Sequence, residues 1–162
     1  MNSVGIVMGS DSDFNVLEAT IKILREFDVS FEVKVSSAHR TLERTLNWVR
    51  TFEEQEGKVI IAAAGMAAHL PGIAAAATTL PIIGVPIKSG ALDGVDALYA
   101  IVQMPPGIPV ATVGINAGKN AGLLAIQILA QTDTRLKEAL KTYRQKMAAE
   151  IEAKDQAIQN KI

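Results

Sequence analysis

Runs of apolar residues alternate with amphipathic stretches along this chain, and the alternation predicts a repeated strand–helix unit. Short continuous apolar runs are typical of buried strands, whereas apolar positions spaced three and four residues apart mark one face of a helix. On this basis strands are predicted over residues 4–8, 30–35, 58–63, 80–85 and 109–113.

The segments between the strands carry helical spacing and helix-ending residues. Helices are predicted over residues 14–27, 41–56, 69–79, 116–130, and from Asp93 or Gly94 to about Met104. A last helix is predicted from residue 134 towards the end of the chain. Asp13 is expected to N-cap the first helix and Asp133 the last, and Gly57 is expected to end the second.

Repeated strand–helix units predict a parallel sheet with right-handed crossovers. The expected fold class is therefore α/β, a three-layer, flavodoxin-like parallel sheet in one domain over residues 1–162 with a long C-terminal helix. Two interpretations of residues 133–162 stay open: a solvated tail, or an arm that packs on a neighbouring subunit. Alanine-rich helices over residues 67–77 and 117–130 favour assembly, because they are more apolar than a one-sided layer needs.

Composition narrows the classes of function. The chain has 162 residues and a formal net charge of −1, which argues against a nucleic-acid partner. The absence of cysteine excludes disulfides and thiolate metal sites. The longest apolar stretch, around residues 59–86, is interrupted by glycine, histidine and proline, so no membrane span is expected. No secretory signal is recognised before the first strand, and a cytoplasmic protein is expected.

Three polar loops follow the first three predicted strands, at residues 9–13, 36–40 and 64–72. In an open α/β sheet, the loops at the carboxyl ends of the strands converge on a ligand crevice. The loops contain both histidines of the chain, several serines, an arginine and aspartates. They therefore predict a site for a small anionic molecule.

The first loop, Gly-Ser-Asp-Ser-Asp, is a tight turn into a helix. Its amides and the hydroxyls of Ser10 and Ser12 can hold a phosphate, and Asp13 can accept from ribose hydroxyls. Helix capping alone is the alternative interpretation. Neither a Gly-x-Gly-x-x-Gly nor a Walker motif is present, so a dinucleotide or nucleoside triphosphate is not expected.

The second and third loops each carry one histidine. Arg40, beside His39, can grip a phosphate through two parallel hydrogen bonds. His69 lies in a loop of small residues that lets a planar ring approach the backbone. A purely structural role is the alternative for each histidine. No metal site is expected, because the histidines lie on different loops without clustered carboxylates.

These motifs, in this order, resemble one family. Gly-Ser-x-Ser-Asp at residues 9–13, Ser-Ala-His-Arg at 37–40 and Ala-Ala-His-Leu-Pro-Gly at 67–72 are similar to the bacterial N5-carboxyaminoimidazole ribonucleotide mutase family of purine biosynthesis. Residues 94–105 and 120–125 also resemble it, and the likeness extends to about residue 140.

The resemblance implies an isomerase that converts N5-carboxyaminoimidazole ribonucleotide to 4-carboxy-5-aminoimidazole ribonucleotide. It implies decarboxylation, retention of CO2 and recarboxylation at C4, with a histidine as acid and base. It also implies a homo-octamer with sites at subunit junctions, and no metal, ATP or organic cofactor. Two alternatives stay open: a carboxylase that uses free CO2, and a non-enzymatic nucleotide-binding module.

The resemblance also implies roles for single residues. His39 corresponds to the general acid and base, and His69 and Gly65 to the loop that faces the imidazole and carboxylate. The implied phosphate-, ribose- and substrate-binding positions are Ser10, Ser12, Asp13, Ser37, Ala38, Arg40 and Leu70. Two residues depart from the family pattern. Leu42 replaces a usual proline, which should affect only the start of a helix, and Met66 stands where glycine is frequent, which should narrow the carboxylate pocket.

Overall fold

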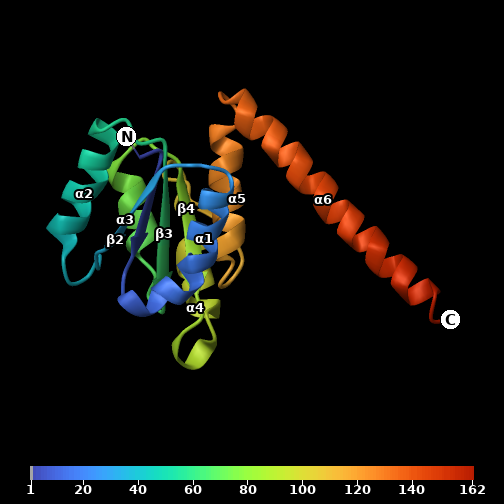
Figure 1. Cartoon of the computed structure of the whole chain (residues 1–162). Helices are drawn as coiled ribbons and strands as arrows, with labels where there is room; N and C mark the ends of the chain where they lie inside the picture. The colour runs from blue at the N-terminus through green and yellow to red at the C-terminus, as the bar shows by residue number, and fades with distance from the viewer. Residues whose placement is uncertain (1) are drawn as a thin grey trace. The chain divides into compact units, whose positions relative to one another are not determined.

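A computed structural model describes residues 2–162; Met1, in the stretch before the first strand where no secretory signal is recognised, lies outside the described residues. Five parallel strands form one sheet in the order β2-β1-β3-β4-β5 (Figure 1). This order is the flavodoxin-like one, so the predicted fold class is confirmed. The elements are β1 (Val4–Met8), η1 (Asp11–Asp13), α1 (Phe14–Glu26), β2 (Phe31–Val35), α2 (Leu42–Glu54), β3 (Val59–Gly65), α3 (Leu70–Ala77), β4 (Ile82–Ile87), η2 (Gly90–Leu92), α4 (Val95–Val102), β5 (Ala111–Thr112), α5 (Gly118–Leu129) and α6 (Thr134–Gln159).

Helices cover both faces of the sheet, and alternation along the strands decides which residues meet which helices. Ile60 and Ala62 of β3 belong to a core cluster with Phe52 of α2, Leu70 of α3 and Ile101 of α4. The intervening β3 residues are also fully buried, because the sheet has a second covered face. A strand covered on both faces must be apolar throughout, which is the continuous pattern that the sequence shows.

α1 and α5 pack closely through glycine. The hydroxyl of Thr20 donates a 2.7 Å hydrogen bond to the carbonyl oxygen of Gly118, and both residues are buried. A β-carbon at Gly118 would clash with the carbonyl oxygen of Val16 and lie 3.0 Å from Thr20 Oγ1. The first turn of α5 can therefore approach α1 only with glycine at this position.

Gly118→Ala is expected to lower the free energy of unfolding by about 2 kcal/mol, the usual cost of overpacking a tight contact. The obstacle is backbone, which cannot rotate away as a flexible side chain can. Gly114→Ala is the matched control, because its β-carbon would meet nothing closer than 3.7 Å. Chemical unfolding measures both variants. Equal midpoints for the two would contradict this account of the α1–α5 contact.

Two predicted caps are wrong in their details. Asp13 precedes α1 but makes no side-chain cap of that helix. Instead Ser10 caps the short helix η1, and Asp13 Oδ2 accepts from the Ser10 amide at 3.1 Å in a capping box. The tight turn inserts η1 before α1, so the carboxylate points back into the loop. Gly57 does not end α2 in the left-handed region either; Glu56 does, with φ +63°.

Gly57 is needed for a different reason, because a β-carbon there would clash with the Phe52 ring. The last strands also differ from prediction. β4 runs on to Ile87 rather than ending at residue 85, and β5 is only Ala111–Thr112. β5 pairs with Ile83 and Gly84 of β4. Pro86 therefore lies beyond the part of β4 that pairs with β5, where no backbone amide hydrogen is needed for a hydrogen bond to β5.

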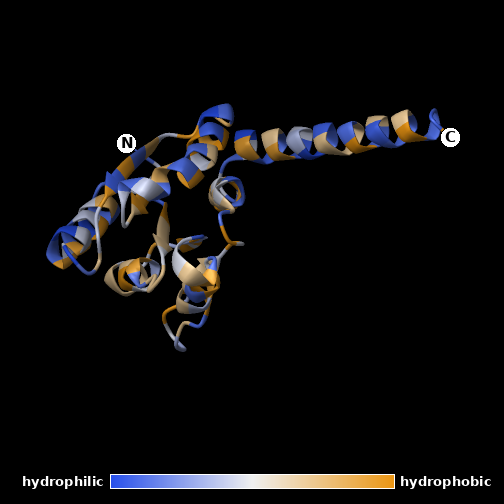
Figure 2. Ribbon diagram, turned by 90° about the horizontal axis from the view of Figure 1, so that it is seen from below, coloured by the Kyte–Doolittle hydropathy of each residue, from blue (hydrophilic) through white to orange (hydrophobic). Residues whose placement is uncertain are grey.

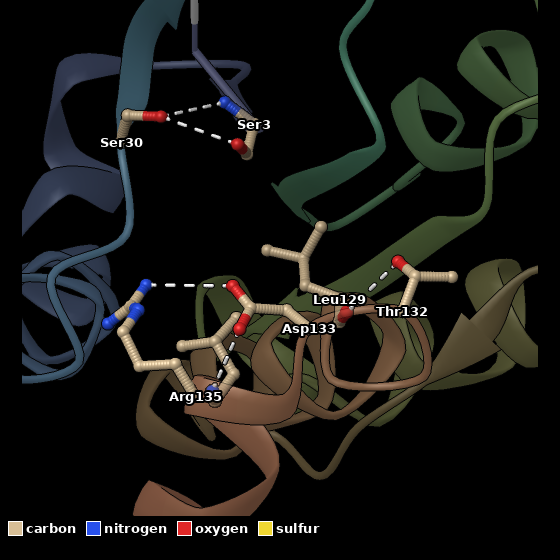
Figure 3. Close-up of polar contacts among 7 residues, drawn as sticks. Ser3, Ser30, Leu129, Thr132, Asp133 and Arg135 are labelled. Atoms are coloured by element: carbon tan, nitrogen blue, oxygen red, sulfur yellow. Dashed lines mark hydrogen bonds and ion pairs between the residues drawn. The ribbon is translucent and has the colours of Figure 1, made fainter.

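The chain forms two compact units, one reaching to Ile126 and one spanning Gln127–Ile162. In the first, the amide of Ser3 donates to Ser30 Oγ at 3.1 Å, where β1 and β2 begin (Figure 3). In the second, Asp133 caps α6 as predicted, accepting from the Leu136 amide at 3.1 Å. Figure 2 shows α6 as mostly hydrophilic with separate apolar bands. No helix within residues 2–162 combines the length and apolarity needed to cross a membrane.

Candidate active site

A cavity of about 490 Å³ lies at the carboxyl ends of four adjacent strands. The sheet order places the β1 and β2 loops next to one another and the β3 and β4 loops on the other side. β2 is added on one side of β1, whereas β3 and β4 are added on the other side. Ligands bind in this fold at the point between β1 and β3 where the order of the strands changes direction. The lining residues are Gly9, Ser10, Ser12, Asp13, Ser37, Ala38, His39, Arg40, Ala64, Gly65, Met66, Ala67, His69, Leu70 and Ser89. Every residue that the sequence analysis proposed for the site is among them.

The side of the cavity formed after β1 and β2 is polar. Ser10 Oγ accepts from the Ser12 amide at 3.4 Å and from the Ser12 hydroxyl at 3.0 Å. Arg40 Nη2 donates to the Gly9 carbonyl oxygen at 3.4 Å, and Arg40 Nε donates to Ser37 Oγ at 3.4 Å. These contacts hold the guanidinium against the serine loop, so a cation and several hydroxyls face the same end of the cavity.

Asp13 is the buried charged group of this side, with 7% of its surface exposed. Burial raises the pKa of its carboxyl above the ordinary value, and hydrogen bonds from the amides of Ser10 and Gly9 oppose that change. The carboxyl therefore stabilises the loop after β1 by accepting these hydrogen bonds, and Asp13 is also part of the cavity lining.

The opposite side, formed after β3 and β4, is mainly small and apolar. Ala64 and Gly65 end β3, Ala67 lies in the loop that follows it, and Leu70 begins α3. Ser89, from the β4 loop, is a lining residue that the sequence analysis missed. Its position two residues after β4 was the available signal, but only the strand order shows that this loop reaches the cavity.

The two histidines meet between these sides. His39 Nε2 and His69 Nδ1 are 2.8 Å apart, and the rings are edge to face with centroids 4.9 Å apart. One of the two nitrogens must donate and the other accept, so the pair holds a proton that either ring can carry. Both side chains are exposed to the cavity, where a substrate can reach them.

The two departures from the family pattern lie in different places. Leu42 is the first residue of α2 and is 43% exposed. Proline suits that position because it has no amide hydrogen to leave unpaired, and leucine is tolerated there. Met66 instead lines the cavity, in a left-handed backbone conformation with φ +54°.

Within residues 2–162, no group of three or more histidine, aspartate or glutamate side chains is arranged to hold a metal ion. The functional groups that line the cavity are the Arg40 guanidinium, serine hydroxyls, the Asp13 carboxyl and two imidazoles. Such a set can bind a phosphorylated sugar at one end and transfer a proton at the middle of the cavity.

Comparison with known proteins points in one direction. The family model described as AIR carboxylase matches residues 3–150. The N5-carboxyaminoimidazole ribonucleotide mutase of Pyrococcus abyssi is 59% identical over 147 residues, covering 91% of this chain and 84% of that protein. The protein of the same name from Mycobacterium tuberculosis strain H37Rv is 49% identical over 156 residues, covering 96% and 90%. The crystal structure of Treponema denticola PurE matches with a TM-score of 0.86 and 31% identity, covering 94% of this chain and 95% of that one.

Proposed function

This chain belongs to the AIR carboxylase family, and we propose that it is an isomerase of purine biosynthesis, converting N5-carboxyaminoimidazole ribonucleotide to 4-carboxy-5-aminoimidazole ribonucleotide. Relatives at 49–59% identity carry the mutase name, which favours the mutase over a carboxylase that uses free CO2. The observation that carries the proposal is the contact of His39 with His69 at 2.8 Å, between a polar and an apolar side of one cavity.

The polar side suits the ribose phosphate. Arg40, Ser10 and Ser12 hold the phosphate, and Asp13 and Ser37 contact the ribose end. Arg40 is already positioned by Gly9 and Ser37, so little conformational freedom is lost on binding. The imidazole ring then lies towards the end of β3, where Gly65 lets it approach closely and Leu70 provides apolar contact, and Ala38 leaves room for it on the side of the loop after β2.

The two histidines carry out the proton transfers of the reaction. As the bond between the exocyclic nitrogen and the carboxyl carbon breaks, His39 donates a proton to that nitrogen and CO2 is released in the cavity. C4 of the ring attacks the CO2 carbon, and neutral His39 then removes the C4 proton, which restores the aromatic ring and the charge of His39. His69 orients His39 through their hydrogen bond and shares the proton. Holding CO2 beside C4 replaces a bimolecular capture with an oriented one.

The decisive assay uses purified protein dialysed against EDTA in a buffer without ATP. We expect conversion of the N5-carboxylated ribonucleotide under these conditions, because the chemistry requires only a proton shuttle and enclosed CO2. A parallel reaction with aminoimidazole ribonucleotide and bicarbonate tests the carboxylase alternative. Conversion only in the second reaction, or only after addition of a divalent ion, would overturn the proposal.

We also propose a homo-octamer in the cytoplasm, in which α6 packs on a neighbouring subunit. α6 has a single buried residue, Leu136, while Met147, Ile151 and Ile158 are 42–63% exposed. Apolar side chains on a polar helix favour burial against another copy. Sedimentation is expected to show an octamer, and deletion of residues 146–162 is expected to weaken it. A stable and fully active monomer would contradict this assembly.

A further inference from the structure

Met66 combines two unfavourable features beside the cavity. Its backbone is left-handed, with φ +54°, a region in which a β-carbon crowds the following carbonyl group. Its apolar side chain is 59% exposed. Strained backbone positions concentrate at functional sites, and an exposed thioether at the wall of a cavity is a contact surface for a ligand.

The side chain of Met66 lies near the loop that follows β4. Met66 follows β3, and a β-carbon at Gly90, in the loop after β4, would lie 3.7 Å from Met66 Cγ and 3.9 Å from its Cε. Because β3 and β4 are adjacent in the sheet, Met66 and the loop after β4 lie on the same, apolar side of the cavity. Met66 is the largest apolar residue that the loop directly after β3 contributes to the lining.

We propose that Met66 is a specificity-determining residue that retains CO2 in the cavity between its loss from nitrogen and its capture at C4. This inference rests on the proposed mutase function. CO2 is small, uncharged and apolar, so an apolar wall beside the reacting ring slows its exchange with water. The bonds that break and form are those of the mutase reaction, and Met66 gives or takes no proton.

The experiment follows the carboxyl carbon. Substrate labelled with ¹³C in its N5-carboxylate is converted in unlabelled bicarbonate buffer, and two quantities are measured: the label retained in the 4-carboxy product, and the free aminoimidazole ribonucleotide formed. Reactions without enzyme correct for spontaneous decarboxylation. Met66→Ala removes the side chain, Met66→Gly also relieves the backbone, and Met66→Leu keeps an apolar side chain of similar size.

We expect several-fold more label loss and free aminoimidazole ribonucleotide per product formed in Met66→Ala and Met66→Gly, and substantial restoration in Met66→Leu. Leu92→Ala is the matched control, because Leu92 is 60% exposed and lies outside the cavity lining; its label retention should equal that of the wild type. Full retention in both Met66→Ala and Met66→Gly, or equal loss in Leu92→Ala, would overturn the role of Met66. Failure of the wild type to convert the substrate would instead refute the proposed function.

Discussion

His39→Asn is expected to lower turnover by about 10²-fold or more, the usual scale for loss of a general acid and base. Asparagine retains a polar side chain but cannot accept and return a proton near neutral pH. His39 is exposed, and among residues 2–162 its side chain makes one polar contact, with His69, so the fold should be preserved. Steady-state turnover, together with circular dichroism of the variant, measures the effect.

His69→Asn separates the two histidines. If His69 acts through His39, its loss should lower turnover less than the loss of His39 does, because His39 keeps the proton-transferring ring and loses only the hydrogen bond that orients it. Binding of the 4-carboxy product should remain close to that of the wild type in both variants. Near-wild-type turnover in folded His39→Asn would refute the mechanism, and would favour a nucleotide-binding module if product binding persisted.

Arg40→Ala is expected to weaken product binding by about 10- to 100-fold, since a hydrogen bond to a charged group contributes about 1.5–3 kcal/mol. The Gly9 carbonyl and Ser37 hold the guanidinium in place, so the guanidinium is already oriented before a phosphate binds. Isothermal titration with the product measures the dissociation constant, and turnover at saturating substrate should change much less.

Two variants make the Arg40 result specific. Arg40→Lys keeps the positive charge but loses the planar fork, so an intermediate loss of affinity is expected. Arg44→Ala removes an exposed arginine in the first turn of α2 that does not line the cavity, and this variant should bind the product as the wild type does. A dissociation constant unchanged by Arg40→Ala would remove Arg40 from the phosphate site.

The sequence by itself determined the order and type of the elements and the loops that contain the chemistry. Apolar runs such as residues 58–63, each followed by a helical stretch, predict buried strands, and parallel strands bring their carboxyl ends to one edge. This reasoning is local, so it reached Ser10, His39, Arg40 and His69 without knowledge of any contact.

Only the tertiary structure decided which groups touch. His39 and His69 are 30 residues apart, and their hydrogen bond exists because β2, β1 and β3 are neighbours in the sheet. Ser89 joins the cavity for the same reason, through the pairing of β4 with β3. Strand order is set by packing of the whole core, which no local pattern specifies.

The tertiary structure also decided the roles of Asp13 and Gly57, which differ from those predicted. Asp13 was expected to cap α1, but the turn at Ser10 and the burial of the carboxyl direct it into a capping box. Gly57 was expected to end a helix, and its small size instead makes room for the Phe52 ring. A residue type shows what a position can adopt, whereas its neighbours in space decide which of those options is used, because close packing leaves room for only one.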